Sequence, residues 1–157
     1  MRKKTIKQAV EGSSPADQNW LDLARLAQVE ITSESEAYPI EAALTPGTGP
    51  GWWAAQPGAQ TIRLIFDQPQ RLQRIYLIFS EEEQARTQEF VLRWLPDGEE
   101  SFREIVRQQY NFSPPGTTRE IEDYGVELNE VRALELLIVP DISGREAWAK
   151  LEALRLA

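Results

Sequence analysis

The feature that most constrains the fold is a series of short segments in which every second residue is hydrophobic, each bounded by turn residues. In one such segment, Ile62, Leu64 and Phe66 share one face of an extended chain. We expect strands at Gln28–Thr32, Ile40–Leu44, Thr61–Phe66, Leu72–Phe79, Gln88–Trp94, Phe102–Tyr110, Ile121–Leu128, Leu134–Val139 and Leu151–Leu156. No long helical segment separates them, which disfavours parallel crossovers and favours an antiparallel sandwich of two sheets.

The alternation also predicts which side chains form the core. Phe90, Leu92 and Trp94 share one face, and we assign them to the core together with the three apolar residues just named. Leu72–Phe79 and Leu134–Val139 are apolar on both faces, so we expect both segments to be buried. Turn chemistry between strands is found at Asp67–Gln70, Pro96–Gly98 and Pro114–Gly116.

The chain is expected to form one domain preceded by an arm. Residues 1–14 are predicted to be a flexible basic arm, and residues 15–157 have the length and composition of a single domain. Ser14 suits the N-cap of a helix and Pro15 suits its first position. Helical spacing follows at Trp20, Leu23, Ala24 and Ala27, so we expect one short amino-terminal helix.

Composition excludes several classes of function. The 157 residues include no Cys and no His, which rules out disulfides, thiolate nucleophiles, imidazole bases and Cys/His zinc sites. The net charge of -8 disfavours nucleic acid as a partner. No apolar run reaches the roughly 18 residues of a membrane span, and no signal-peptide pattern follows the amino-terminal basic cluster. We therefore expect no membrane association and a cytoplasmic location.

The order of strand and turn signals between residues 20 and 157 carries a family resemblance. It runs through Val29–Glu34, Pro39–Leu44, the Gly51-Trp52-Trp53 turn, Gln60–Phe66, Gln88–Trp94, the Asp97-Gly98 hairpin, Ala133–Pro140 and Leu151–Leu156. This order resembles the discoidin or coagulation-factor type C domain of the galactose-binding-domain-like superfamily. The resemblance implies an all-β, antiparallel jelly-roll β-sandwich of eight strands. It also assigns Leu151–Leu156 as a strand, although the Ala, Leu and Glu content there favours a helix.

The same resemblance leaves the ligand open. Members of the superfamily serve as sugar-binding, lipid-binding and protein-binding modules and as appendages to enzymes. The paired Cys residues that often join the termini of the domain are absent here.

The loop Thr45–Gly58 holds the first candidate binding residues, Trp52 and Trp53. An aromatic face on a rigid loop can stack on a sugar ring or accept a cation. The alternative is that one Trp plugs the end of the sandwich, and we assign that role to Trp53 because large aromatic side chains prefer burial. Trp52 is then the predicted ligand contact.

Two groups of carboxylates could carry chemistry. Glu34, Glu36 and Glu41 could act as acid and base in glycoside hydrolysis, but ion pairs with Arg86 and Arg119 that brace the loops are the favoured interpretation. The second group could supply oxygen ligands to Ca²⁺, although consecutive Glu residues are usually a solvated charge run. It comprises Ser80–Glu83, Gly98–Glu100 and Asp141. We expect no metal or cofactor, with structural calcium as the alternative.

The loops Asn111–Thr118 and Asp141–Trp148 carry further aromatic and polar residues that could recognise a sugar or a peptide. Their side chains could instead cover the end of the sandwich. Taken together, the candidate ligand-binding residues are Trp52, Trp53, Arg86, Phe112, Arg145 and Trp148.

Two classes of function remain open. The first is a noncatalytic module that binds a carbohydrate or small ligand through its end loops and has a concave, aromatic and polar site. The second is an intracellular protein-interaction or assembly subunit with a flat patch and no pocket. We favour the first and expect the chain not to be an enzyme.

Overall fold

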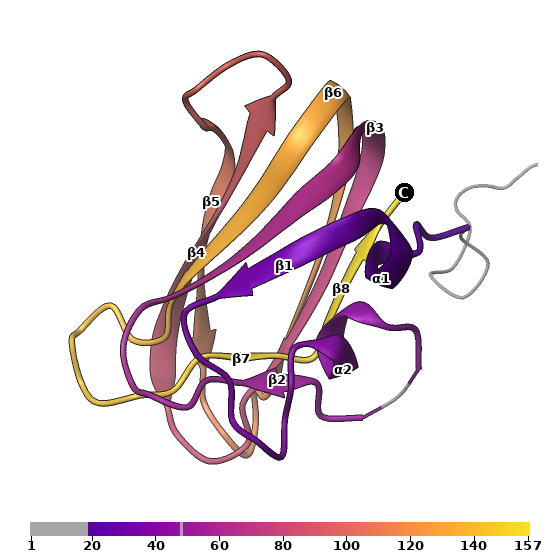
Figure 1. Ribbon diagram of the computed structural model, residues 1–157. Helices are drawn as coiled ribbons and strands as arrows, with labels where there is room; N and C mark the ends of the chain where they lie inside the picture. Colours follow the sequence, from indigo (N-terminus) through magenta and orange to yellow (C-terminus); the bar gives the residue numbers. More distant parts are fainter. Residues whose placement is uncertain (1–18, 48) are drawn as a thin grey trace, which may run out of the picture.

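The chain folds into an antiparallel β-sandwich, seen in a computed structural model that describes residues 19–47 and 49–157 (Figure 1). The predicted basic arm, with Ser14 and Pro15, lies outside the described residues. The strands are β1 (Ala27–Ile31), β2 (Trp52–Trp53), β3 (Gln60–Ser80), β4 (Arg86–Pro96), β5 (Arg103–Phe112), β6 (Arg119–Val139), β7 (Lys150–Leu151) and β8 (Ala153–Leu156). Two short helices complete the described part: α1 (Leu23–Leu26) precedes β1, and α2 (Glu41–Leu44) lies between β1 and β2. The predicted fold class is confirmed.

Two long strands, β3 and β6, run through both layers of the sandwich. The first part of β3 pairs with β1 and with the end of β6. The end of β6 also pairs with β4, and β4 pairs with β5. The second part of β3 pairs with the start of β6 and with β8. Between Ile65 and Arg74 the β3–β6 register shifts three times. This is where the strand pair passes from one layer to the other.

The predicted turn at Asp67–Gln70 is therefore a bend within one strand. Residues Gln60–Ser80 form a single continuous strand, although the sequence predicts two separate strands there. The same holds for the two predicted strands within Arg119–Val139. Turn-forming residues in the middle of a long strand resemble those of a hairpin, and only the strand pairing distinguishes a bend from a turn.

The predicted strand Ile40–Leu44 is wrong, because Glu41–Leu44 forms helix α2. The buried residues Ile40, Ala43 and Leu44 follow helical spacing, and the segment contains two Ala residues, the best helix former. The Glu34 carboxylate accepts a hydrogen bond of 2.8 Å from the Ile40 N–H, which satisfies a donor at the start of the helix.

Among the residues from position 19 onward, the predicted amino-terminal helix is present but shorter than expected. It covers only Leu23–Leu26, and Ala27 already belongs to β1. Pairing of Val29 with Leu64 and of Ile31 with Ile62 extends the chain immediately after the helix. The carboxy-terminal strand assignment is confirmed, with the segment divided between β7 and β8.

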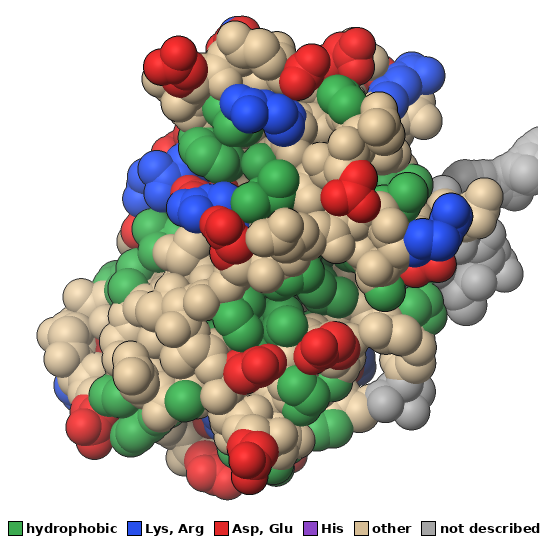
Figure 2. Space-filling view, viewed as in Figure 1, with side chains coloured by type: hydrophobic (Ala, Val, Ile, Leu, Met, Phe, Trp, Pro, Cys, Tyr) green, Lys and Arg blue, Asp and Glu red, His purple; other side chains and the backbone are tan. Residues whose placement is uncertain are grey.

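The core lies between the two layers. Of the six predicted core residues, all except Trp94 are buried. Trp94 is half-buried near the end of β4, with the Arg103 guanidinium 5.6 Å from its ring centroid. Figure 2 shows apolar side chains gathered between β1 and the helices, where Leu23, Val29 and Leu44 line a hollow of about 380 Å³. The core thus reaches the surface beside β1. No helix in the described part of the chain is long and apolar enough to cross a membrane.

A buried carboxyl group interrupts this apolar interior. Glu120 on β6 is 1% exposed, and its Oε1 accepts a hydrogen bond of 3.1 Å from the Gln88 amide. Its Oε2 has no partner in the described structure. Loss of hydration on burial, together with the neighbouring Glu122 carboxylate, raises the pKa of Glu120 to about 9. The group is therefore protonated at neutral pH.

The first prediction concerns the pH dependence of stability. The pKa of Glu120 is raised in the folded chain, so its contribution to stability is complete below about pH 4.5 and is lost as the pH rises towards 9. Glu120→Gln removes the ionisation and keeps the shape. At pH 8 we expect the free energy of unfolding of this variant to exceed that of the parent by at least about 1 kcal/mol, since one pKa unit corresponds to about 1.4 kcal/mol. The advantage should shrink towards pH 4.5.

Urea unfolding of both proteins at several pH values measures this difference. Glu100→Gln, at an exposed residue, serves as the control and should change little at any pH. An advantage of Glu120→Gln that stays constant from pH 4.5 to pH 8 would show that the pKa of Glu120 is not raised.

Candidate functional site

The candidate site is built on a two-stranded ribbon at one end of the sandwich. In this ribbon β2 pairs with β7, so that Trp52 lies opposite Leu151 and Trp53 lies opposite Lys150. Because side chains alternate between the two faces of a strand, one pair faces the core and the other faces outward. Trp52 and Leu151 are fully buried, whereas Trp53 and Lys150 are only partly buried.

Gly51 holds this ribbon in place. Its φ of +79° is favourable only for glycine, and a Cβ there would lie 2.2 Å from the Leu151 carbonyl oxygen. The Trp52 indole N–H donates to the Ser33 carbonyl at 3.0 Å, which satisfies its polar atom inside the core. The prediction that Trp52 faces a ligand and Trp53 plugs the sandwich is therefore wrong. Trp52 is the buried ring of the pair, and Trp53 is the partly exposed one.

Both faces of the Trp53 ring are occupied. The Tyr38 ring stacks on it with centroids 3.9 Å apart and an angle of 14° between the planes. The Lys150 ammonium lies 4.4 Å from the same ring centroid. Two groups at such short distances cannot share one face, so they lie on opposite faces. Trp53 thus offers its edge, and not its face, to a ligand.

Trp148 supplies an exposed aromatic side chain. The segment leading into β7 alternates, with Ala147, Ala149 and Leu151 fully buried. Trp148 and Lys150 consequently point outward from the same side of the chain. The Trp148 side chain is 38% exposed, an unusual exposure for the largest apolar side chain.

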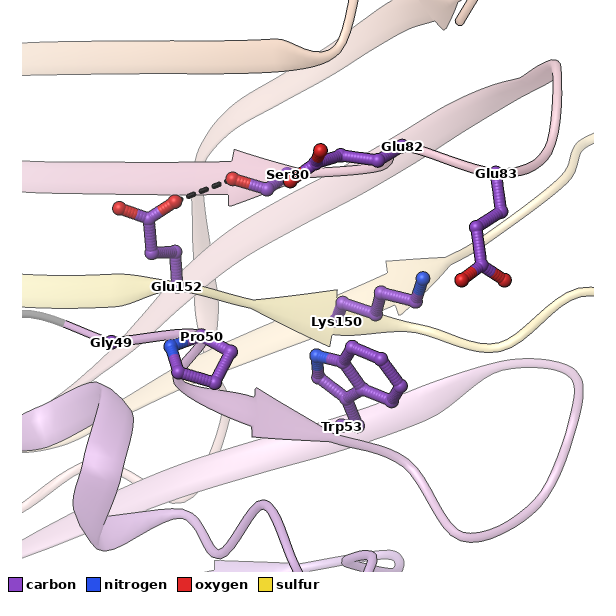
Figure 3. A pocket seen from close by; sticks show the side chains of 8 residues that line it. All are labelled: Gly49, Pro50, Trp53, Ser80, Glu82, Glu83, Lys150 and Glu152. Carbon is purple, nitrogen blue, oxygen red and sulfur yellow. Dashed lines mark hydrogen bonds between the residues drawn. The ribbon is translucent and has the colours of Figure 1, made fainter.

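Two adjoining hollows open around these residues. The first, which we call the aromatic hollow, has a volume of about 560 Å³ and is lined by Trp53, Trp148, Lys150, Glu34, Glu36 and Gln84, among others. The second, the serine hollow, has about 510 Å³ and includes Ser80, Glu82 and Glu152 (Figure 3). Both share Trp53, Glu83 and Lys150, and together we call them the end site. Volumes of this size suit small ligands.

Figure 3 shows how the shared residues lie. Lys150 extends from β7 over the Trp53 ring, and the Glu83 side chain points down towards the ammonium group from the loop after β3. On the other side of the serine hollow, the Ser80 hydroxyl donates to the Glu152 carboxylate. Three segments distant in sequence thus meet at the end site.

A buried ion network supports the end site from below. Arg86 and Glu81 are both buried, and the Arg86 Nε lies 2.8 Å from the Glu81 Oε1. The second Glu81 oxygen accepts from the Lys150 ammonium at 3.1 Å and from the Glu83 N–H at 3.0 Å. Burial opposes ionisation of Glu81, but these hydrogen bonds and the two positive charges outweigh it and lower its pKa.

Besides the buried Trp52, three of the predicted binding residues do not reach the end site. Arg86 is buried in the ion network, where it also donates to the Pro140 carbonyl at 2.8 Å. Phe112 is buried beneath it, with the Arg86 guanidinium 4.8 Å from its ring centroid. Arg145 is exposed but lines neither hollow, because Asp141 and the Ala85 carbonyl hold it elsewhere. Of the six candidates, only Trp53 and Trp148 come together at the surface.

The predicted bracing ion pairs are also different from those observed. Arg86 pairs with Glu81, and Arg119 pairs with Glu152 at 3.0 Å. Neither contacts Glu34, Glu36 or Glu41 through an ion pair in the described structure. Among the described residues, no group of three or more acidic, His or Cys side chains could hold a metal ion. The expectation of no metal or cofactor, with structural calcium as the alternative, stays a prediction.

Sequence reasoning missed Lys150 as a site residue. Its position two residues after Trp148 and immediately before the buried Leu151 is a strand-like alternation that could have indicated it. Gln84 gave no comparable signal. It reaches the aromatic hollow because the loop after β3 folds back, with its amide donating to the Glu146 carbonyl at 3.0 Å.

Comparison with solved structures identifies the architecture. A family 32 carbohydrate-binding module of AlyQ, in complex with 4,5-unsaturated mannuronic acid, covers 84% of this chain and 95% of its own, with a TM-score of 0.60 and 14% identity. The family 32 module of C. perfringens NanJ, in complex with galactose, covers 83% and 92%, with a TM-score of 0.61 and 9% identity. The chain has the galactose-binding-domain-like fold.

The fold also occurs within larger enzymes. A Ruminococcus gnavus fucosidase, in complex with fucose, matches 85% of this chain over 26% of its own length, with a TM-score of 0.63 and 9% identity. Identities this low establish the fold and not the ligand. No family model and no curated protein sequence matches the chain.

The second prediction tests the network beneath the end site. Arg86→Met should lower the free energy of unfolding by about 3 to 5 kcal/mol, because it leaves the Glu81 carboxylate buried with less compensation. Arg71→Met is the matched control, since Arg71 pairs with Glu127 where both side chains are exposed, and should cost at most about 1 kcal/mol. Urea unfolding gives both values. Equal losses in the two variants would contradict a structural role for the Arg86–Glu81 pair.

Proposed function

We propose that this chain is a noncatalytic carbohydrate-recognition module whose binding site is the end site. The observation that carries the proposal is the exposed Trp148 side chain beside a polar hollow. A sugar ring presents an apolar face of C–H groups that packs on an aromatic ring, and its hydroxyls need directional hydrogen-bond partners. The end site offers both kinds of contact within one concavity.

The polar groups around Trp148 suit hydroxyl recognition. The Glu34 and Glu36 carboxylates can accept hydrogen bonds, and the Gln84 side chain can both donate and accept. These groups come from loops held by the sheets, so they are positioned before a ligand arrives. Such preorganisation reduces the entropy lost on binding.

The absence of catalysis is part of the proposal. A general acid at a sugar site needs a carboxyl with a raised pKa beside the scissile bond. Glu120 has a raised pKa but is buried between the two layers and lines neither hollow. Hollows rather than a flat patch also favour ligand recognition over the alternative of an assembly subunit without a small-molecule site.

The third prediction is that a glycan binds through Trp148. We would titrate the protein with neutral, aminated and acidic oligosaccharides by isothermal calorimetry and repeat the positive titrations with Trp148→Ala. Loss of the stacking face should weaken binding by about tenfold or more, corresponding to roughly 1.4 kcal/mol. Ile121→Ala, at another exposed apolar residue that lines neither hollow, should bind like the parent.

Two outcomes would refute the proposal. One is that no oligosaccharide in the panel binds the parent protein. The other is that a glycan binds and Trp148→Ala leaves its affinity unchanged, which would place the carbohydrate site elsewhere on the molecule.

A further inference from the structure

The electrostatic character of the end site distinguishes between classes of sugar. Solved structures with this fold hold ligands as different as an unsaturated mannuronic acid and galactose, so the fold leaves the charge of the ligand open. The charge of a suitable ligand has to be inferred from the charged side chains around the two hollows. The inference that follows rests on the proposed function and concerns the same site.

Carboxylates dominate the lining of both hollows. Among the described lining residues, the single basic side chain in both hollows is Lys150, and the acidic ones are Glu34, Glu36, Glu81, Glu82, Glu83 and Glu152. Closely spaced charges of one sign beside a low-dielectric wall reinforce one another and create a strong local potential. The potential at the end site is negative.

The nearby basic groups are already used. Lys150 is bound to Glu81, and Arg119 is bound to Glu152. The Glu81 network combines one carboxylate with the positive charges of Arg86 and Lys150, so it carries one surplus positive charge. Against it stand four carboxylates without a basic partner in the described structure, those of Glu34, Glu36, Glu82 and Glu83. Lys150 is therefore poorly placed to receive an anionic sugar.

The carboxylates are spread around the hollows instead of converging on one point. This agrees with the lack of any described acidic group that could hold a metal ion. Glu34 and Glu36 border the aromatic hollow, whereas Glu82 borders the serine hollow and Glu83 lies between them. The arrangement matches positive charges repeated along a chain better than it matches one compact ion.

The exposed aromatic ring favours the same charge. The face of an indole ring attracts cations through its quadrupole, and Trp148 lines a hollow bordered by carboxylates. We propose that the end site selects glycans that carry protonated amino groups, such as oligomers of glucosamine, over the corresponding N-acetylated sugars and over oligomers of uronic acids. The amines would meet the unpaired carboxylates while a ring of the glycan stacks on Trp148.

The fourth prediction tests this selectivity with three tetrasaccharides of defined charge. Calorimetric titration would compare a glucosamine tetramer, its N-acetylated form and a galacturonic acid tetramer, at a pH at which the amines are protonated. We expect the glucosamine tetramer to bind at least about tenfold more tightly than the N-acetylated form, and the galacturonic acid tetramer to bind most weakly. Binding of the glucosamine tetramer should weaken as salt is added.

Charge-neutralising variants assign the selectivity to the end site. Glu36→Gln and Glu83→Gln should each weaken binding of the glucosamine tetramer by about two- to fivefold, the range of exposed ion pairs. Glu100→Gln removes the same charge in the loop between β4 and β5, which lies at the far end of the sandwich from β2 and β7 (Figure 1), and should have no effect. Equal effects of all three variants would mean that only the net charge of the protein matters and would overturn the inference.

The outcomes also separate this inference from the function on which it rests. Binding of a neutral or acidic tetramer as tight as that of the glucosamine tetramer, and lost in Trp148→Ala, would overturn the charge selectivity and leave carbohydrate recognition standing. No binding by any of the three tetramers or by the wider glycan panel would overturn both.

Discussion

The arrangement of the end site depends on one buried ion pair, between Glu81 and Arg86. Glu81 follows the end of β3 and Arg86 begins β4, and the same guanidinium donates to the carbonyl of Pro140 just after β6. The second Glu81 oxygen extends the network to Lys150 on β7. Four strands are thereby joined at one end of the sandwich. Because two buried charges would be costly apart, the loop between β3 and β4 has little freedom to move away.

This network decides what the site presents to solvent. The hydrogen bond to Glu81 places the Lys150 ammonium over one face of Trp53, while Tyr38 covers the other face. Trp148 is then the exposed aromatic side chain of the aromatic hollow. Arg86 and Lys150 are both engaged by Glu81, so the outer carboxylates have no basic partner among the described residues.

Sequence patterns predicted the sandwich because alternation is local. The alternation within each segment shows which of its residues share a face. The strands around Ile62, Phe90 and Leu154 form where alternation or resemblance predicted them. Long-range facts were not predictable in this way. Whether Trp52 or Trp53 faces the core depends on the close approach of Gly51 to Leu151, about a hundred residues later. Likewise, the sequence does not show that Arg86 is buried, because its burial depends on distant partners such as the Pro140 carbonyl and the ring of Phe112.

The central claim is that a glycan binds against Trp148 at the end site. The most direct measurement is the NMR signal of each indole N–H during titration with a glucosamine tetramer, with the signals assigned by single Trp→Phe substitutions. The account predicts a saturable shift of the Trp148 signal, a smaller shift of the Trp53 signal and an unchanged Trp94 signal at the edge of the core. Binding that shifts the signal of Trp94 and leaves that of Trp148 unchanged would contradict it.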